Sequence, residues 1–173
     1  VPTVIDIDGD GLNDLVVGAQ TWYKQPKQDK HIAKNWRAFS IGKTVWPMNC
    51  LPHDVDQDGD FDLVVPDRRK ELFWYENMGK ETIGQPWPRH QLHPFNGSMF
   101  MDIGDVNLDG IDDFAFAGGY QGKAPHVKKL VVLIRTNKSG APTYDEVLIE
   151  QPCGNFPKGI KIMDIDGDPS TME

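Results

Sequence analysis

The chain has 173 residues, of which 39% are hydrophobic and 25% are charged, a composition typical of a folded globular domain rather than of a disordered tail. No apolar run approaches the ~20 residues of a membrane helix, and no segment is basic enough to indicate a nucleic-acid surface. The formal net charge is -8, from 26 acidic and 18 basic residues. We therefore expect neither membrane insertion nor a nucleic-acid partner.

The acidic residues are concentrated in a small part of the chain. Sixteen of the 26 lie in four short segments, 6–14, 54–62, 105–113 and 164–168. Carboxylates packed this closely repel one another at neutral pH, so the clustering predicts a bound counter-ion. Three divalent cations would bring the net charge to about -2.

The four acidic segments are copies of one pattern. The first loop, residues 6–14, reads DIDGDGLND and continues into LVVG. The second loop, 54–62, reads DVDQDGDFD before LVVP, and the third loop, 105–113, reads DVNLDGIDD before FAFAG. A fourth segment begins DIDGD at 164–168 and continues with Pro169. The copies start 48, 51 and 59 residues apart, a period that indicates a repeat architecture.

The remainder of each unit also recurs, as runs of aromatic and β-branched residues bounded by Gly, Pro and Asn. These runs are 21–23 and 36–41, then 72–77 and 87–92, then 130–135 and 144–149. No stretch shows helical periodicity with caps. Each unit predicts one strand before the loop, one after it and two more. We expect an all-β partial β-propeller of about three four-stranded antiparallel blades, with the acidic loops between strands.

We place the whole chain, 1–173, in one propeller fragment. Its units are roughly 1–45, 46–96 and 97–155, with the start of a fourth at 156–173. Because a propeller needs ~4–8 blades to close, we expect further blades in a longer protein, or other subunits, to complete the ring. The N-terminus has neither a basic region nor an apolar core of a signal peptide. We expect that a signal was removed, or that the chain begins inside a longer protein.

The loop pattern predicts calcium ligands. Carboxylates at alternate positions of a tight loop can converge on one ion, glycine at position 6 permits a sharp turn with positive φ, and the all-oxygen donor set favours calcium over zinc or copper. We predict about three Ca²⁺ ions, with side-chain ligands at positions 1, 3, 5 and 9 and a carbonyl ligand at position 7. The ligands are Asp6, Asp8, Asp10, Leu12 and Asp14; Asp54, Asp56, Asp58, Asp60 and Asp62; and Asp105, Asn107, Asp109, Ile111 and Asp113. Asn107 supplies a neutral oxygen, so we expect the third site to be weaker.

The acidic loops have two alternative interpretations, an EF-hand and a turn without metal. An EF-hand needs Glu at position 12 and flanking helices, but position 12 is Val17, Val65 or Phe116. Asp, Asn and Gly also favour turns without any metal, which suffices for one copy but explains three copies in register less well. In the fourth segment Pro169 replaces the glycine and Met172 stands at position 9, so we expect a weak or empty site there.

These loops resemble the FG-GAP/VCBS repeats of integrin α-subunit propellers and of many bacterial extracellular proteins, and residues 74–77, WYEN, look like the third-strand signature of VCBS-type repeats. The resemblance implies an extracellular, cell-surface or periplasmic module that acts as a binding or adhesion scaffold for a glycan or protein. It leaves open a polysaccharide lyase or another glycan-active enzyme. Some propellers resembling this one use His, Tyr and Arg for proton abstraction. Such residues here are His31, His53, His90, His93, His126, Arg37, Arg68, Arg69, Arg89, Tyr23, Tyr75 and Tyr120, and for each a packing or surface role is favoured.

We assign no catalytic residue, because no hydrolase triad or phosphate loop is found. Trp22 with Trp74, and Trp36 with Trp87, recur at equivalent places and predict cores between blades, whereas Trp46 falls outside this register. Cys50 and Cys153 are the only cysteines, and the sequence leaves open whether they pair.

Overall fold

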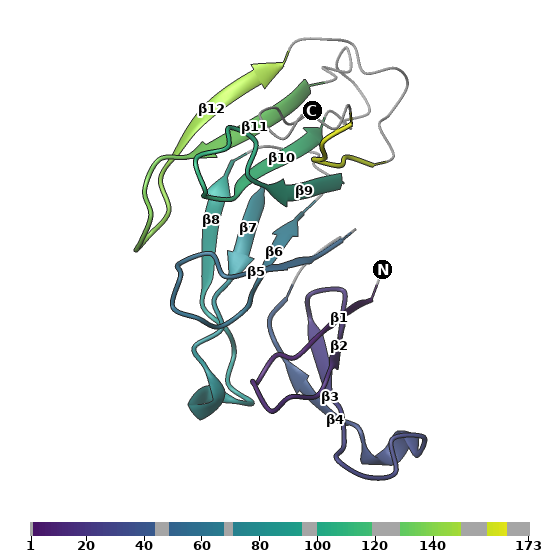
Figure 1. Cartoon of the computed structure of the whole chain (residues 1–173). Helices are drawn as coiled ribbons and strands as arrows, with labels where there is room; N and C mark the ends of the chain where they lie inside the picture. Colours follow the sequence, from purple (N-terminus) through teal and green to yellow (C-terminus); the bar gives the residue numbers. More distant parts are fainter. Residues whose placement is uncertain are drawn as a thin grey trace.

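The computed structural model describes residues 2–43, 49–67, 71–94, 100–118, 129–149 and 159–165. These residues form three four-stranded antiparallel sheets, which follow one another in chain order from the bottom to the top of Figure 1. The all-β prediction is confirmed. The only helices described are two short 3-10 turns, η1 (Ala33–Asn35) and η2 (Lys80–Thr82).

Each sheet is a simple meander, so strands adjacent in sequence are also adjacent in the sheet. The first sheet contains β1 (Thr3–Ile5), β2 (Asp14–Val17), β3 (Thr21–Lys24) and β4 (Arg37–Ser40). The second contains β5 (Leu51–His53), β6 (Asp62–Pro66), β7 (Leu72–Tyr75) and β8 (Arg89–His93). The third contains β9 (Phe100–Gly104), β10 (Asp113–Gly118), β11 (Lys129–Arg135) and β12 (Tyr144–Ile149).

The three acidic loops occupy the same place in the three sheets. Each joins the first two strands, and the residue before position 1 pairs directly with the aspartate at position 9. These pairs are Ile5 with Asp14, His53 with Asp62, and Gly104 with Asp113. Since the register is identical, equivalent residues of the three units can be compared one by one.

The middle sheet is buried on both faces because it packs against the first sheet on one side and the third on the other, and its side chains alternate between the two. Leu63 and Val65 of β6 join the core shared with the first sheet, whereas Val64 joins the core shared with the third. Trp22 lies in the first of these cores and Trp74 in the second, as the sequence predicted. Successive sheets are thus held together mainly by apolar burial.

Two buried hydrogen bonds repeat between the sheets. Asn77 lies two residues after the end of β7, and its side-chain amide donates to the carbonyl of Ile7 in the first loop (3.0 Å). Its register equivalent, Arg135, donates from Nη1 to the carbonyl of Val55 in the second loop (2.7 Å). Ile7 and Val55 both occupy loop position 2. Each blade therefore contacts the acidic loop of the preceding blade through one polar side chain.

The segment 159–165 lies beside the third sheet and contacts it through a different pair of bonds. The backbone N–H of Ile162 and the Lys161 ammonium both donate to the Asp102 carboxylate of β9, at 2.9 Å and 2.8 Å. The first strands of the three sheets also contact one another in order, β1 with β5 and β5 with β9. The start of the fourth unit packs against the first strand of the third sheet.

One expectation about the tryptophans was wrong. Trp87 is buried in the core between the first and second sheets, but Trp36 is only half-buried and donates its indole N–H to the Lys30 carbonyl. Trp36 and Trp87 do hold equivalent register places, because Ala38 pairs with Tyr23 as Arg89 pairs with Tyr75. The first sheet covers Trp87, whereas no sheet among the described residues covers Trp36. Trp46 lies outside the described residues.

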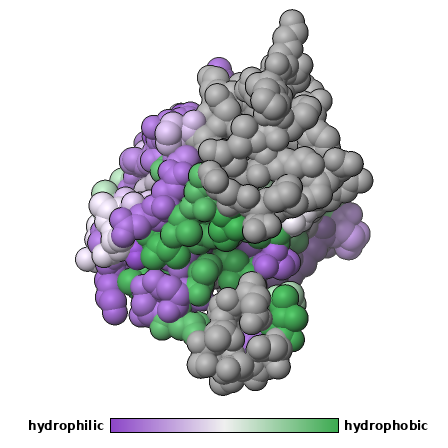
Figure 2. Space-filling model, turned by 90° about the horizontal axis from the view of Figure 1, so that it is seen from above, coloured by the Kyte–Doolittle hydropathy of each residue, from purple (hydrophilic) through white to green (hydrophobic). Residues whose placement is uncertain are grey.

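Cys50 is a free, buried cysteine whose Sγ lies 3.3 Å from the Thr3 hydroxyl. Cys153 lies outside the described residues. Within the part of the chain that the structure describes, no helix is long and apolar enough to cross a membrane. Figure 2 shows a band of hydrophobic side chains on the face seen from above, flanked by hydrophilic ones.

The core between the first two sheets gives a stability prediction. Trp22 is 1% exposed, whereas its neighbour Tyr23, on the opposite face of β3, is 37% exposed. We expect Trp22→Ala to lower the free energy of unfolding by about 3–5 kcal/mol, because it leaves a large cavity. Tyr23→Ala, the matched control, is expected to cost less than about 1 kcal/mol. Urea unfolding followed by circular dichroism measures both, and equal losses would contradict the assigned core.

Candidate metal centres in the acidic loops

The aspartate at position 1 organises each loop from within. Its two carboxylate oxygens accept the backbone N–H groups of positions 5 and 6. The bonds to the position-6 glycines measure 2.8 Å in the first loop, 3.1 Å in the second and 2.7 Å in the third. These charge-assisted bonds explain why an aspartate, whose short side chain reaches neighbouring amides, stands at this position.

Two positions of each loop take a left-handed backbone conformation. The glycines at position 6 have φ of 83°, 99° and 85°, as the sequence predicted. Position 4 is also left-handed, with φ of 65° at Gly9, 64° at Gln57 and 60° at Leu108. This second turn was not predicted from the sequence, although Gly9 was a signal for it. Gln57 and Leu108 adopt a conformation that costs non-glycine residues about 1–2 kcal/mol.

The aspartate at position 9 fastens the loop to the rest of its sheet. Asp14, Asp62 and Asp113 are almost completely buried. In each, one oxygen accepts the N–H of loop position 2 and the other accepts an N–H at or just after the end of the third strand. The second bond comes from Gln25 (2.7 Å), Asn77 (2.8 Å) and Arg135 (2.8 Å). This structural role was not predicted from the sequence.

Burial of these carboxylates is electrostatically costly without a cation. Desolvation raises the pKa of Asp14 to about 6 and that of Asp62 to about 7, although the backbone hydrogen bonds that both carboxylates accept act to lower it. Desolvation also raises the pKa of Asp113. In the second loop, burial and the charge of Asp58 raise the pKa of Asp56. A divalent cation in the loop would favour the ionised forms.

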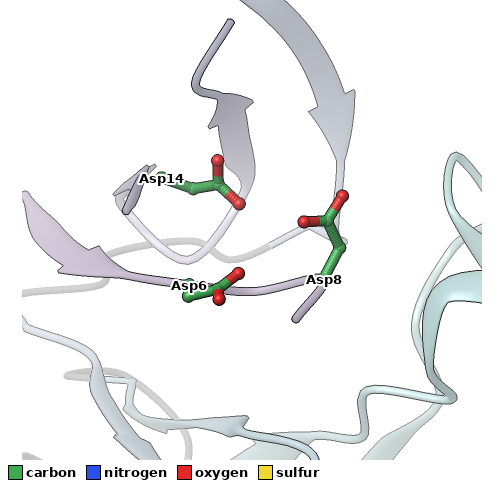
Figure 3. Close-up of side chains that lie close together, drawn as sticks. All are labelled: Asp6, Asp8 and Asp14. Atoms are coloured by element: carbon green, nitrogen blue, oxygen red, sulfur yellow. The ribbon is translucent and has the colours of Figure 1, made fainter. Parts of the chain in front are cut away.

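Three carboxylates gather in the first loop. Oxygens of Asp6, Asp8 and Asp14 lie within 4.8 Å of one another, and their side chains point into the same space (Figure 3). The Asp8 side chain is only 5% exposed, and its Oδ1 is buried without a hydrogen-bond partner. Asp10 instead turns to Lys24, which also bonds Asp8.

In the second loop, oxygens of Asp54, Asp56 and Asp58 lie within the same 4.8 Å limit. Of the predicted ligands, the structure thus groups positions 1, 3 and 9 in the first loop and positions 1, 3 and 5 in the second. Asp62 lies on the buried side of its loop, bonded to the Val55 and Asn77 backbone.

In the third loop, Asn107 replaces one carboxylate, and its amide contributes a donor. Asn107 Nδ2 bonds Asp109 Oδ2 at 2.8 Å, while its Oδ1 accepts the Asp109 N–H. Asp105 keeps the position-1 role, and Asp113 keeps the position-9 role.

The position-7 residues have one common contact. The N–H groups of Leu12, Asp60 and Ile111 donate to the position-5 carboxylates at 2.9–3.0 Å. This fixes the peptide that precedes the predicted carbonyl ligand.

The residues present fit calcium. They supply only oxygen donors, several ionised, from a loop in which most carboxylates are already oriented by backbone N–H groups. The buried, unpartnered Oδ1 of Asp8 is an oxygen for which a cation would be a suitable partner. In the fourth segment Asp164 is exposed, and Asp166, Asp168, Pro169 and Met172 lie outside the described residues.

Most of the described residues that were considered for proton abstraction have separate partners. His90 stacks on Trp74 and contacts Glu76, and Tyr75 donates to the Lys43 carbonyl. Other pairs are His53 with Asp112, His93 with Glu146, Arg37 with Phe39 and Arg89 with Glu71 and Phe73. Arg68, Arg69, Tyr120 and His126 lie outside the described residues. These contacts support packing and surface roles.

Comparison with protein families decides the relationship. Residues 1–31 match the model of the FG-GAP repeat, and residues 54–116 match that of the FG-GAP-like repeat, so the matches together cover more than half of the chain. The chain belongs to the FG-GAP repeat family. The matched residues include all three loops, and the three sheets are successive blades of a partial β-propeller. No curated protein or solved structure gave a significant match.

The buried carboxylates of the FG-GAP loops predict an unusual pH dependence. Because the folded-state pKa values of Asp14 and Asp62 lie above the ordinary value of an aspartate, protonation stabilises the calcium-free fold. In chelator, the melting temperature should rise as the pH falls from about 8 to about 6.5, since Asp62 then takes up a proton. Saturating calcium should abolish this rise, because bound carboxylates stay ionised. Differential scanning calorimetry measures both profiles, and identical profiles would contradict the account.

The left-handed residue at loop position 4 gives a second prediction. Leu108 is 42% exposed and has φ of 60°, so Leu108→Gly relieves strain while losing little burial. Allowing for the greater entropy of unfolded glycine, we expect a gain of about 0.5–1 kcal/mol in unfolding free energy. Gly110→Ala, two residues away, should instead lose about 1 kcal/mol, because its φ of 85° is unfavourable for alanine. An added Cβ there meets no atom, so no steric clash adds to this loss. Chemical denaturation that gives the two variants the same sign would refute this.

Proposed function

We propose that the chain is a calcium-binding, extracellular β-propeller module that acts as a binding or adhesion scaffold for a glycan or protein. The observation that carries this proposal is the repeated gathering of oxygen donors in the loops, with one buried oxygen of Asp8 lacking a partner. Calcium binding is also what the FG-GAP resemblance implies. The millimolar calcium outside cells suits loops of this kind, which supports an extracellular, surface or periplasmic setting.

The role proposed for calcium is structural. Each loop joins two strands, and its position-9 carboxylate holds the third strand of the same blade. The carbonyl at position 2 accepts a side-chain hydrogen bond from the next blade, from Asn77 or Arg135. An ion that fixes the loop would therefore stabilise both the blade and its contact with the next one.

The outer face of the first sheet supports the proposal that further blades complete the ring. Val17 and Tyr23 on that face are 48% and 37% exposed. Their register equivalents in the second sheet, Val65 and Tyr75, are 0% and 2% exposed because the first sheet covers them. We propose that another blade, from a longer chain or another subunit, packs on this apolar face in the same way.

Calcium dependence of stability tests the metal role. Three sites saturated at about 100 times their dissociation constants contribute up to about 2.7 kcal/mol each. We expect added chelator to lower the melting temperature by at least about 5 °C, and excess calcium to restore it. Magnesium at the same concentration, the control, should restore less, because it prefers a smaller octahedral shell. An unchanged melting temperature in chelator would overturn the proposal.

An acidic polysaccharide assay separates the scaffold from an enzyme. Retention of a glycan without turnover supports the binding scaffold, whereas release of unsaturated product would show a lyase instead. The scattered contacts of the described His, Arg and Tyr residues favour retention.

A further inference from the structure

Lys24 places a positive charge inside the first acidic loop. Its ammonium bonds Asp8 Oδ2 and lies 2.7 Å from Asp10 Oδ2. The Lys24 side chain is 25% exposed, the Asp8 side chain 5% and the Asp10 side chain 18%, so the group is partly removed from water. An ammonium at this depth interacts with its carboxylates more strongly than a surface ion pair does.

This contact replaces a hydrogen bond that the other two loops make. In the second and third loops, the side-chain oxygen at position 3 accepts the N–H of position 5, at 3.3 Å for Asp56 and 3.1 Å for Asn107. Asp8 stands at the same position, yet one of its oxygens bonds Lys24 and the other has no partner. Lys24 and the loop backbone therefore leave one carboxylate oxygen of the first loop, Asp8 Oδ1, without a partner.

The position of Lys24 is chemically different in each blade. In the shared register, Lys24 follows Tyr23, Glu76 follows Tyr75, and Ile134 follows Leu133. The same place beside the loop is thus basic in the first blade, acidic in the second and apolar in the third. Glu76 adds negative charge near Asp56, whereas Lys24 cancels part of the charge of its loop.

We propose that Lys24 is a built-in cation that competes with calcium for Asp8 and Asp10, so that the first loop binds calcium more weakly than the second. This inference rests on the proposed calcium function. Calcium must displace or repel the ammonium before Asp8 and Asp10 can become ligands, and this cost is absent in the second loop. In return, Lys24 partly neutralises the first loop when calcium is scarce.

The test is a calcium titration of the full chain, followed by ¹H–¹⁵N correlation spectra. The position-6 amides of Gly11, Gly59 and Gly110 report on one loop each, because each donates to the position-1 carboxylate. In the wild type, the Gly11 signal should shift at higher calcium than that of Gly59. Lys24→Gln should lower the Gly11 midpoint by about tenfold or more and leave the other two in place.

Two further variants make the comparison specific. Glu76→Lys, at the equivalent position, should raise the Gly59 midpoint by a similar factor. Lys27→Gln removes an exposed charge that acts on Asp10 from a distance, and it should change the Gly11 midpoint by less than about threefold. In calcium-free buffer, Lys24→Gln should also melt at a lower temperature than the wild type.

The outcomes separate this inference from the proposed function. If Gly59 and Gly110 respond to calcium but Lys24→Gln leaves the Gly11 midpoint unchanged, the competition is absent while calcium binding stands. If no loop responds in any variant, calcium binding itself is refuted. Should Lys24→Gln fail to fold without calcium, recovery on adding calcium supports the proposal. Failure to fold in calcium as well overturns it, because Lys24 would then be needed for folding alone.

Discussion

A buried aspartate carboxylate at the end of each acidic loop holds the three blades in their common form. Asp14, Asp62 and Asp113 each accept one N–H from the loop and one from a residue at or just after the end of the third strand of the same sheet. Burying an ionised group is unfavourable unless hydrogen bonds and a counter-charge offset the loss of water. The buried, hydrogen-bonded carboxylates that order the loops therefore also create their need for positive charge.

The three loops share one backbone design but differ in how far they meet this need. Lys24 supplies positive charge to the first loop and the neutral Asn107 amide supplies a hydrogen-bond donor to the third, whereas the second has the acidic Glu76 at the place of Lys24. Between blades, Asn77 and Arg135 donate to loop carbonyls, so the conformation of one loop is coupled to the packing of the next blade against it. The charge of each loop and the packing of the blades are consequently linked.

Much of this architecture follows from the sequence. The spacing of acidic residues, the apolar runs after them and the glycines at position 6 predicted the three sheets and their loops. Lys24 could not be assigned to the first loop, because its contact depends on the pairing of β2 with β3 rather than on local spacing. The left-handed Gln57 and Leu108 were missed because tertiary closure of the loop overrides their local preference. Trp36 differs from Trp87 in burial because the first sheet packs over Trp87, whereas no described sheet packs over the equivalent face of the first sheet.

The central claim is that carboxylate oxygens in repeated loops surround a calcium ion. A crystal structure of the full chain grown in calcium, with anomalous diffraction data, tests it most directly. The account predicts an anomalous peak within about 2.6 Å of several oxygens in the second loop, and in the first loop at sufficient calcium. Loops that keep their carboxylates bonded only to backbone N–H groups, with no peak among them at saturating calcium, would contradict it.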